Sequence, residues 1–485
     1  MPEPWKLTID ERMYDELMEH LFPGDDDEHA AVIAAGVART ARGTRLLARD
    51  LFLAVDGIDF VPGIRAYRML KAAFVRERIQ YCRDEQLVYL GIHNHGGRDE
   101  VDFSDPDIHS HERGYPALLA ISRQPVGGLV VAQNAIAGDI WAPDGSQRTI
   151  SETAVLGRNI HRIYPLPPPP PPSADPSYDR QVRWLGQRGQ DALSRAKVAV
   201  VGAGGVGLPL TTMLARLGVG QILVIDPDRM EPENLPRMPE ARRSDAMMQL
   251  RRLPGARRPA IKRLLDRLGT RKVRLARRAV LRANPKATFV AIPKSVAEPE
   301  AARELLDCDF IFLAADSHLA RMIVNLIGHQ YLIPVIQMGT RIDVDEDTGA
   351  VGEIRTNVRL ILPHQGCIRC NGYIDSTKVQ EDAIGVAERE RNRYIDEVPA
   401  PSVITFNTLS AAQAATDFLL MLGGLISDDA TLDYIRFRPR RRECTPIRSV
   451  TNRSSCPHCG TARHSRRARG DSVELPLPER SRGSR

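Results

Sequence analysis

A run of glycines directly after an apolar segment restricts how the second half of this chain can fold. KVAVVGAGGVG (197–207) has the pattern of a buried strand and a tight turn, and a helical stretch and a second apolar strand, QILVIDPD (221–228), follow it. This order of elements predicts a parallel, doubly wound α/β sheet. The turn contains a GxGxxG pattern, Gly202, Gly204 and Gly207, which lets phosphate oxygens approach backbone N–H groups at the start of a helix. We therefore expect a nucleotide at this turn.

The polar residues around the glycine turn distinguish ATP from a dinucleotide. Asp226 lies 19 residues after the last glycine, where an acid would hold a ribose hydroxyl in either kind of site. Arg180 lies just upstream of the first strand, Arg237 lies beyond the second, and Asp316 follows a third apolar strand. Hydride transfer needs no such collection of cations and acids, whereas nucleotidyl transfer uses arginines to neutralise a triphosphate and an aspartate to hold Mg²⁺. The sequence therefore favours ATP with Mg²⁺.

These motifs resemble those of the ThiF and MoeB type of adenylyltransferases, within the ubiquitin-activating superfamily. The resemblance runs from about residue 178 to 460 and includes YxRQ, the glycine turn, DxD, NLxR, a lysine twelve residues before Asn284-Pro285, AxD and two CxxC pairs. It implies that the C-terminal carboxylate of a ubiquitin-like or sulfur-carrier protein attacks the α-phosphate of ATP, and that the enzyme is a homodimer. The nucleotide-site residues that it implies are Gly202, Gly204, Gly207, Asp226 on the ribose, Asp228, Asn234, Lys272, Arg180 and Arg237 on the triphosphate, and Asp316 on Mg²⁺.

Two departures from the family pattern affect the expected site and reaction. A basic insertion lengthens the passage between NLxR and the family's lysine, so Lys262 competes with Lys272 for that role. Family members that carry their substrate as a thioester usually have a cysteine in the crossover, but 371–401 contains none here, and Cys444 is the alternative thiol. We therefore expect adenylation without a thioester.

Two CxxC pairs point to a metal site. Cysteines in a chain expected to be cytosolic should stay reduced, so clusters of them suggest metal binding or catalysis rather than disulfides. The pairs are Cys367 with Cys370 and Cys456 with Cys459. Two such pairs form the closed tetrahedral set of a structural zinc site, and a redox CxxC is the alternative. A zinc ion here would fasten the C-terminal end to the core.

The first third of the chain contains a second candidate metal site. His93 and His95 lie two residues apart at the end of an apolar strand, so their side chains point to the same face and can share a metal. Asp107 adds a third ligand and leaves the fourth position to water, as in catalytic zinc sites. Glu28, ahead of another apolar strand, is the candidate general base. Ser104 and Asp107 also fit a capping box, in which case the stretch is only a turn and a helix start.

A glutamate before a strand, then HxH, then Ser-x-x-Asp resembles the motif of the JAMM (JAB/MPN) metalloproteases, which remove ubiquitin-like proteins or trim their tails. The resemblance covers roughly residues 7–150. It implies that the two histidines and the aspartate bind zinc, that Glu28 is the acid/base and that Ser104 stabilises the oxyanion. Asn94 stands where the family usually has Ser or Thr, and one extra residue precedes Ser104.

A proline-rich run separates the two halves. Residues 164–176 contain too many prolines for a helix or sheet and predict a semi-rigid spacer. Before it, we expect a mixed α/β domain with helices near 7–21 and 63–81 and strands near 30–37 and 45–55. The predicted divisions are a JAMM-like domain at 1–163, the linker at 164–176, the adenylyltransferase domain at 177–460 and a basic disordered tail at 461–485.

The distribution of charge and of apolar residues argues against two classes of partner, nucleic acid and membrane. Residues 238–272 contain eleven Arg or Lys against three Asp or Glu, which outweighs the chain's net charge of +6, and few aromatic residues accompany them. A solvated basic insertion explains this better than a nucleic-acid site. No apolar run is long enough to span a membrane, and we expect a cytoplasmic protein.

The sequence thus predicts a fusion of a zinc isopeptidase with an ATP-dependent activator, both acting on a β-grasp protein that ends in glycine. Two alternatives stay open. The adenylated carboxylate could belong to a small peptide, and the JAMM-like domain could be a degenerate module that only binds a ubiquitin-like protein.

Overall fold

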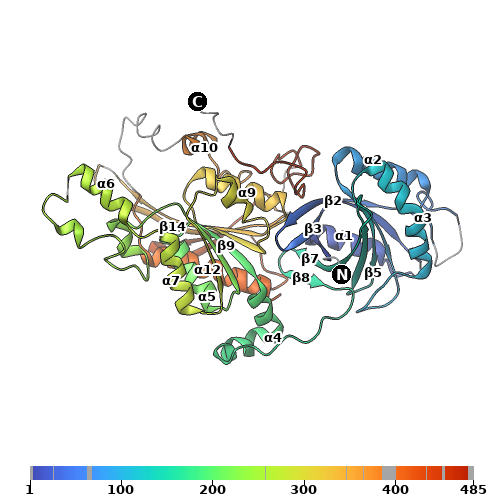
Figure 1. Ribbon diagram of the computed structural model, residues 1–485, viewed down its shortest axis with the longest axis horizontal. Coiled ribbons are helices and arrows are strands. Elements are labelled where there is room, and N and C mark those ends of the chain that lie inside the picture. Colours follow the sequence, from blue (N-terminus) through green and yellow to red (C-terminus); the bar gives the residue numbers. More distant parts are fainter. Residues whose placement is uncertain are drawn as a thin grey trace.

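The computed structural model describes residues 4–478, except 26, 63–67, 257, 346, 364, 385–399, 433 and 451–453. Figure 1 shows two α/β domains side by side, with the N-terminal domain on the right and the C-terminal domain on the left. The proline-rich segment runs below them as an extended chain and leads into helix α4 (Asp179–Arg195). Within the described residues, no helix is both long and apolar enough to cross a membrane.

The N-terminal domain contains an eight-stranded sheet in the order β1-β3-β2-β4-β5-β6-β7-β8, and β1 also pairs with β7, which closes the sheet on itself. Helix α1 covers one face, and helices α2 and α3 cover the other. The elements are β1 (Trp5–Asp10), α1 (Glu11–Leu21), β2 (Ala30–Thr40), β3 (Gly43–Leu53), α2 (Ala72–Glu85), β4 (Val88–Asn94), α3 (Asp105–Ser122), β5 (Val126–Val131), β6 (Ile136–Trp141), β7 (Gln147–Leu156) and β8 (Ile160–Ile163).

The predicted strands of this domain are confirmed, and two predicted helices begin later than expected. The helix expected from residue 7 begins at Glu11, because the alternating residues before it form β1 and the Asp10 carboxylate caps the helix by accepting the Met13 N–H at 3.1 Å. The helix expected from residue 63 begins at Ala72, and residues 63–67 lie outside the described part.

The C-terminal domain confirms the predicted doubly wound sheet. Its strand order is β11-β10-β9-β12-β13-β14-β15-β16; the strands are parallel from β11 to β13 and antiparallel beyond. Helices α5, α7 and α12 pack on one face, and α8 and α9 pack on the other. The elements are β9 (Lys197–Val201), α5 (Gly207–Arg216), β10 (Gln221–Ile225), α6 (Pro259–Leu268), α7 (Lys272–Ala283), β11 (Thr288–Ile292), α8 (Pro299–Arg303), β12 (Phe310–Leu313), α9 (His318–Gln330), β13 (Val335–Val344), β14 (Val351–Ile361), α10 (Ser376–Ala383), α12 (Ile404–Leu422), β15 (Tyr434–Arg438) and β16 (Glu443–Ile447), with short 3₁₀ helices η1 (Pro176–Tyr178), η2 (Pro232–Arg237), η3 (Leu250–Arg252) and η4 (Pro439–Arg441).

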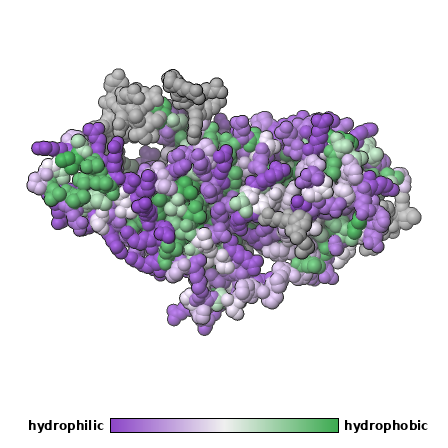
Figure 2. Space-filling model, viewed as in Figure 1, coloured by the Kyte–Doolittle hydropathy of each residue, from purple (hydrophilic) through white to green (hydrophobic). Residues whose placement is uncertain are grey.

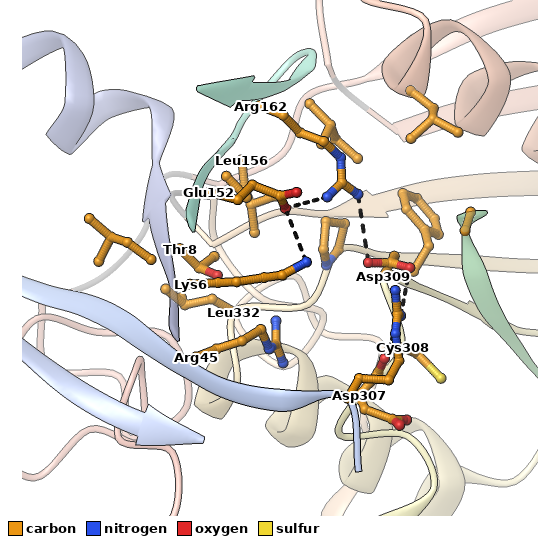
Figure 3. A pocket seen from close by; sticks show the side chains of 18 of the residues that line it. Lys6, Thr8, Arg45, Glu152, Leu156, Arg162, Asp307, Cys308, Asp309 and Leu332 are labelled. Atoms are coloured by element: carbon orange, nitrogen blue, oxygen red, sulfur yellow. Dashed lines mark hydrogen bonds and ion pairs between the residues drawn. The ribbon is translucent and has the colours of Figure 1, made fainter. Parts of the chain in front are cut away.

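The two domains share a polar contact. In Figure 3, Arg162 of the N-terminal sheet lies between Glu152 of the same sheet and Asp309, the residue before β12. Arg162 lies 3.7 Å from the Asp309 carboxylate, and Arg42 donates to it at 2.8 Å. Burial alone would raise the pKa of Asp309, but these two guanidinium groups hold it below its usual range. The carboxylate therefore stays charged and paired between the domains.

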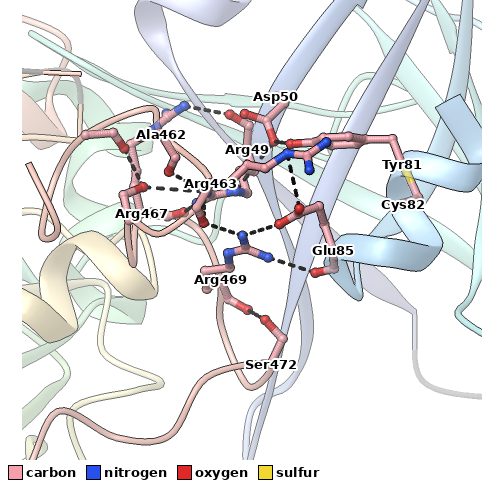
Figure 4. A network of polar contacts seen from close by, with 12 residues as sticks. Arg49, Asp50, Tyr81, Cys82, Glu85, Ala462, Arg463, Arg467, Arg469 and Ser472 are labelled. Carbon is pink, nitrogen blue, oxygen red and sulfur yellow. Dashed lines mark hydrogen bonds and ion pairs between the residues drawn. The ribbon is translucent and has the colours of Figure 1, made fainter. Parts of the chain in front are cut away.

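Residues 461–478 contradict the predicted disordered tail, whose last residues, 479–485, lie outside the described part. Residues 461–478 are described, and Figure 4 shows 462–472 lying against the N-terminal domain beside Arg49 and Glu85. Arg467 forms a buried ion pair with Asp10 at 3.0 Å, and Gly470 bridges to Val37 of β2. Ion pairs and backbone hydrogen bonds to both domains hold the segment in place, so it is ordered without an apolar face of its own.

We expect Arg467→Ala to lower the free energy of unfolding by about 3–5 kcal/mol, because it leaves the buried Asp10 carboxylate without its partner. Urea denaturation followed by circular dichroism measures the change. The control is Arg463→Ala, whose side chain is 71% exposed and pairs with Glu85 at 3.3 Å; there we expect a loss below about 1 kcal/mol. Equal effects of the two substitutions would contradict the assignment of Arg467 as the main tie.

Candidate functional sites

The three glycines of the turn have the separate roles that a phosphate loop requires. Gly202 has φ +98°, and a Cβ there would lie 2.8 Å from the Ala315 backbone nitrogen. A Cβ on Gly207 would lie 1.8 Å from the Gly202 carbonyl oxygen, so the first and third glycines are needed for packing. Around Gly204 the space is open to 4 Å, which leaves room for a phosphate against the backbone.

Two aspartates and a lysine lie at the carboxyl end of β10, beside the turn. The buried Asp226 carboxylate accepts the Ala203 N–H at 2.7 Å and the Asp228 N–H at 2.8 Å. The Lys272 ammonium lies 2.7 Å from the Asp228 carboxylate, while Lys262 is exposed on α6. Burial raises the pKa of Asp226, and the charge of Lys272 opposes that rise. The structure therefore places Lys272, and not its rival, beside these acids.

Arg237 and a residue that the sequence did not single out lie over the glycine turn. A Cβ on Gly205 would lie 3.4 Å from the aliphatic stem of Arg237 and 2.5 Å from the amide nitrogen of Asn407. Asn407 is buried in the first turn of α12 and donates to Ser402 at 3.0 Å. Its side chain thus closes one side of the turn, and only its position near the start of the helical stretch FNTLSAAQAATDFLL could have indicated it.

Three other predicted residues differ in how they relate to the turn. Asn234 is buried, and its side-chain oxygen accepts the Glu231 N–H at 3.1 Å, so it shapes the loop that carries Arg237. Asp316 is exposed two residues after Ala314, whose carbonyl carbon would lie 2.9 Å from a Cβ on Gly202. Arg180 is exposed on α4 and makes no hydrogen bond or ion pair to the others within the described residues.

The four cysteines of the CxxC pairs meet at one point. Their sulfur atoms lie within 4.8 Å of one another, with Cys367 at 3.7 Å from Cys370 and at 3.9 Å from Cys456, and Cys370 at 3.8 Å from Cys459. Sulfur ligands 2.3 Å from a tetrahedral zinc are about 3.8 Å apart. The cluster therefore fits zinc in size and donor type. Of the predicted crossover, residues 385–399 lie outside the described part, and Cys444 is exposed on β16.

The two histidines and the aspartate of the N-terminal domain also converge. The Nε2 atoms of His93 and His95 lie 3.1 Å apart, and each lies 3.3 Å from an oxygen of Asp107. Ligand atoms at 2.0–2.1 Å from a tetrahedral zinc are about 3.3 Å apart, so this set fits zinc as well. Burial would raise the pKa of Asp107, but hydrogen bonds from His93 and Ser104 hold it well below its usual range.

The capping box and the ligand set coexist. The Ser104 hydroxyl donates to Asp107 at 2.6 Å and also accepts the Asp107 N–H, so it caps α3 while orienting the third ligand. Glu28 lies just before β2, where Ala30 pairs with His93 of β4. Burial raises the pKa of Glu28, and the two histidines and Asp107 act on it electrostatically.

Asn94 holds the segment that carries Glu28. Its side-chain oxygen accepts the His29 N–H at 2.6 Å, and its amide nitrogen donates to the Asp27 carbonyl at 3.5 Å. The two bonds fall on either side of Glu28. The residue that departs from the family pattern thus positions the candidate acid/base.

A second HxH lies on α3. On a helix His109 and His111 diverge by about 200°, so they cannot share a metal, and the spacing predicts two surface residues. His109 is exposed, but the same divergence turns His111 inward, where its Nδ1 lies 3.0 Å from Asp139 and its ring stacks on Tyr115 at 4.3 Å.

Comparison with known proteins supports the predicted family of the second domain. A model of the ThiF family matches residues 178–458, more than half of the chain. The chain is 33% identical over 165 residues to the adenylyltransferase and sulfurtransferase MOCS3 of Mus musculus, covering 33% of this chain and 31% of that protein. It is 30% identical over 184 residues to the sulfur carrier protein adenylyltransferase of Thermus thermophilus, covering 37% and 60%. The match thus spans less than two thirds of either relative.

Among solved structures, the chain is similar to MccB of E. coli, crystallised with MccA-N7isoASN. The TM-score is 0.44 at 19% identity, and the alignment covers 59% of this chain and 76% of that one.

Proposed function

The chain belongs to the ThiF family, and we propose that its second domain adenylates the C-terminal carboxylate of a ubiquitin-like or sulfur-carrier protein, using ATP and Mg²⁺. The proposal rests on the cluster of Asp226, Asp228 and Lys272 beside the glycine turn. Within that turn, Gly204 is the glycine with free space around its Cβ position. This cluster lies at the carboxyl ends of β9 and β10, where doubly wound sheets bind their ligands.

Each residue of this set has a chemical task in adenylation. The backbone around Gly204 would hold phosphate oxygens, and Asp226 would accept a ribose hydroxyl. Arg237 and Lys272 would neutralise the triphosphate while the protein carboxylate attacks the α-phosphate and pyrophosphate leaves. Asp316 would hold Mg²⁺. Among the described residues Arg180 forms no hydrogen bond or ion pair with this set, and a homodimer would let it serve the site of a second copy.

ATP–pyrophosphate exchange tests this proposal. The purified chain is incubated with ATP, Mg²⁺, labelled pyrophosphate and a small β-grasp protein that ends in Gly-Gly. We expect label to enter ATP only when that protein is present, because the adenylate forms reversibly on its carboxylate. Exchange supported by a short peptide but not by any folded protein would assign the activity to a peptide substrate instead.

We also propose that the N-terminal domain is a zinc peptidase of the JAMM type. The observation that favours it is the spacing of His93, His95 and Asp107, which matches a tetrahedral zinc site with one ligand position left. Zinc bound there would lower the pKa of a water to about 7. Glu28, whose own pKa is raised by burial, would take and return the proton, and the Ser104 hydroxyl would stabilise the oxyanion.

Cleavage of a β-grasp protein extended beyond its C-terminal glycine tests the peptidase proposal. We expect release of the extension in the presence of zinc. Binding without cleavage, by a domain that holds no zinc, would support the alternative of a degenerate binding module.

In this reaction Asn94→Ala should lower kcat by about 10–100-fold with zinc content unchanged, because it frees the backbone on both sides of Glu28 while the three ligands stay in place. Zinc analysis and cleavage rates measure the two effects. Asn134→Ala, which removes an exposed bond to Asp99, is the matched control and should leave both unchanged. Loss of zinc together with activity would instead place Asn94 in the support of the ligands.

A further inference from the structure

The basic insertion ends in a helix that is almost wholly exposed. Of α6 (Pro259–Leu268), only Leu265 is buried. Ile261, Leu264 and Leu268 lie at helical spacing on one face and are 37%, 55% and 51% exposed. With Leu250 and Leu253 of the preceding turns they form the α6 patch, Leu250, Leu253, Ile261, Leu264 and Leu268.

The α6 patch is unusual for this molecule. It contains five of the twenty large apolar side chains that are exposed among the described residues, within a stretch of 250–268. Figure 2 shows an apolar area at the end of the molecule where Figure 1 places α6. Single exposed leucines are common on protein surfaces and need no explanation, but a contiguous exposed apolar surface of this kind marks an interaction site.

Cations surround the patch. Arg251 is paired with Asp266 at 2.5 Å, but the other described cations of 250–268 form no ion pair within the described residues. These are Arg252, Arg258, Lys262, Arg263 and Arg267, all exposed. The apolar side chains of the patch are therefore interspersed along 250–268 with exposed cations that form no ion pair within the described residues.

The cations and the apolar side chains of the α6 patch indicate which kind of partner fits it. A second copy of the chain, bound through the same patch, would bring its cations against these cations, which is unfavourable. A nucleic acid would pair with the cations but leave the leucines exposed, and no aromatic residue lies in 250–268 for base stacking. An acidic protein surface with an apolar centre satisfies both features.

The insertion is rooted at the proposed nucleotide site. It begins directly after Arg237, and its helix α6 ends four residues before Lys272. At its root, the Met230 N–H donates to the Thr270 carbonyl at 2.8 Å and the Lys272 N–H donates to the Asp228 carbonyl at 3.0 Å. A protein held on α6 is therefore held by a segment whose base lies beside the residues proposed to bind ATP.

We propose that the α6 patch docks the folded body of the protein whose C-terminus is adenylated, a protein with an acidic surface around an apolar patch. The proposal rests on the proposed adenylation. A short C-terminal peptide would reach the nucleotide site without touching α6, so peptide and whole protein report separately on the two.

The test compares Leu264→Asp/Leu268→Asp with the wild-type chain in ATP–pyrophosphate exchange. The probes are the Gly-Gly-terminated β-grasp protein from the source genome that supports the fastest exchange, and a synthetic peptide of its last six residues. We expect KM for the whole protein to rise at least about tenfold with kcat unchanged, and KM for the peptide to stay within about twofold. Leu166→Asp, an exposed leucine of the linker, is the control and should change neither value.

Two results would overturn the proposal. An unchanged KM for the whole protein would remove the docking role, and an equal rise for protein and peptide would place the effect in the nucleotide site. If KM is unchanged and the variant loses a wild-type dimer in sedimentation, or loses binding to phosphatidylserine vesicles, the patch would be assigned to that other occupant. No exchange by the wild-type chain with any probe would instead reject the proposed adenylation, and this inference with it.

Discussion

Lys272→Ala should reduce ATP–pyrophosphate exchange by about 10²–10³-fold, which is the effect of removing one preorganised charge from a nucleotidyl-transfer site. The Lys272 ammonium lies 2.7 Å from Asp228, and its charge also acts on the buried Asp226. Without it, two carboxylates at the carboxyl end of β10 would face the phosphates with no cation between them. The loss should therefore appear mainly in kcat, with protein and peptide substrates affected alike.

The control for this prediction is Lys286→Ala. Its side chain is 80% exposed and pairs with Asp175, so we expect exchange within about twofold of wild type. If Lys272→Ala retains wild-type exchange, the Asp228–Lys272 pair is structural and the nucleotide site lies elsewhere. Circular dichroism of the variant separates this result from unfolding.

The glycine turn and its neighbours could be predicted because their signals are local. The spacing of Gly202, Gly204 and Gly207 after an apolar strand determines a turn whose geometry the structure reproduces. Lys272, the lysine nearer to Asn284, begins α7 and lies beside Asp228, which favours it over Lys262, and its role at the nucleotide stays a prediction. A single helix, α5, separates the turn from the strand that carries Asp226, whereas Lys272 lies 44 residues after Asp228, beyond the basic insertion.

The features that the sequence did not reveal depend on contacts between distant segments. Arg467 and Asp10 are 457 residues apart, and no pattern of apolar residues in the last part of the chain indicates that they pair. Asn407 reaches the glycine turn only because α12 packs against α5. The inward turn of His111 depends on Asp139 of β6, so a helical projection alone could not predict its partner.

The placement of the C-terminal segment relates the two candidate metal sites. The chain leaves Cys459 and reaches Arg467 and Gly470, which contact Asp10 and β2 of the N-terminal domain. Strand β2 begins two residues after Glu28 of the proposed peptidase site. The cysteine cluster thus anchors one end of the segment that holds the two domains together.

Purified protein should contain two zinc ions per chain, and His95→Ala should lose one of them together with all measurable peptidase activity. Removing one of three protein ligands leaves zinc held by His93 and Asp107 alone, while the structural cluster is untouched. Cys456→Ala should lose the other ion and loosen 461–478, because structural zinc contributes about 10–16 kcal/mol to the folding of the segment that binds it. Zinc analysis by mass spectrometry and hydrogen exchange at 461–478 measure the two effects.

The two variants serve as controls for each other. His95→Ala should keep the protection of 461–478, and Cys456→Ala should keep the zinc held by the histidines, because the two ligand sets share no residue. A single zinc per chain, lost only with Cys456→Ala, would contradict the peptidase proposal: the His93, His95 and Asp107 cluster would then be a capped helix start with two neighbouring histidines. Adenylation would be unaffected by that result, since none of its proposed residues lies in the N-terminal domain.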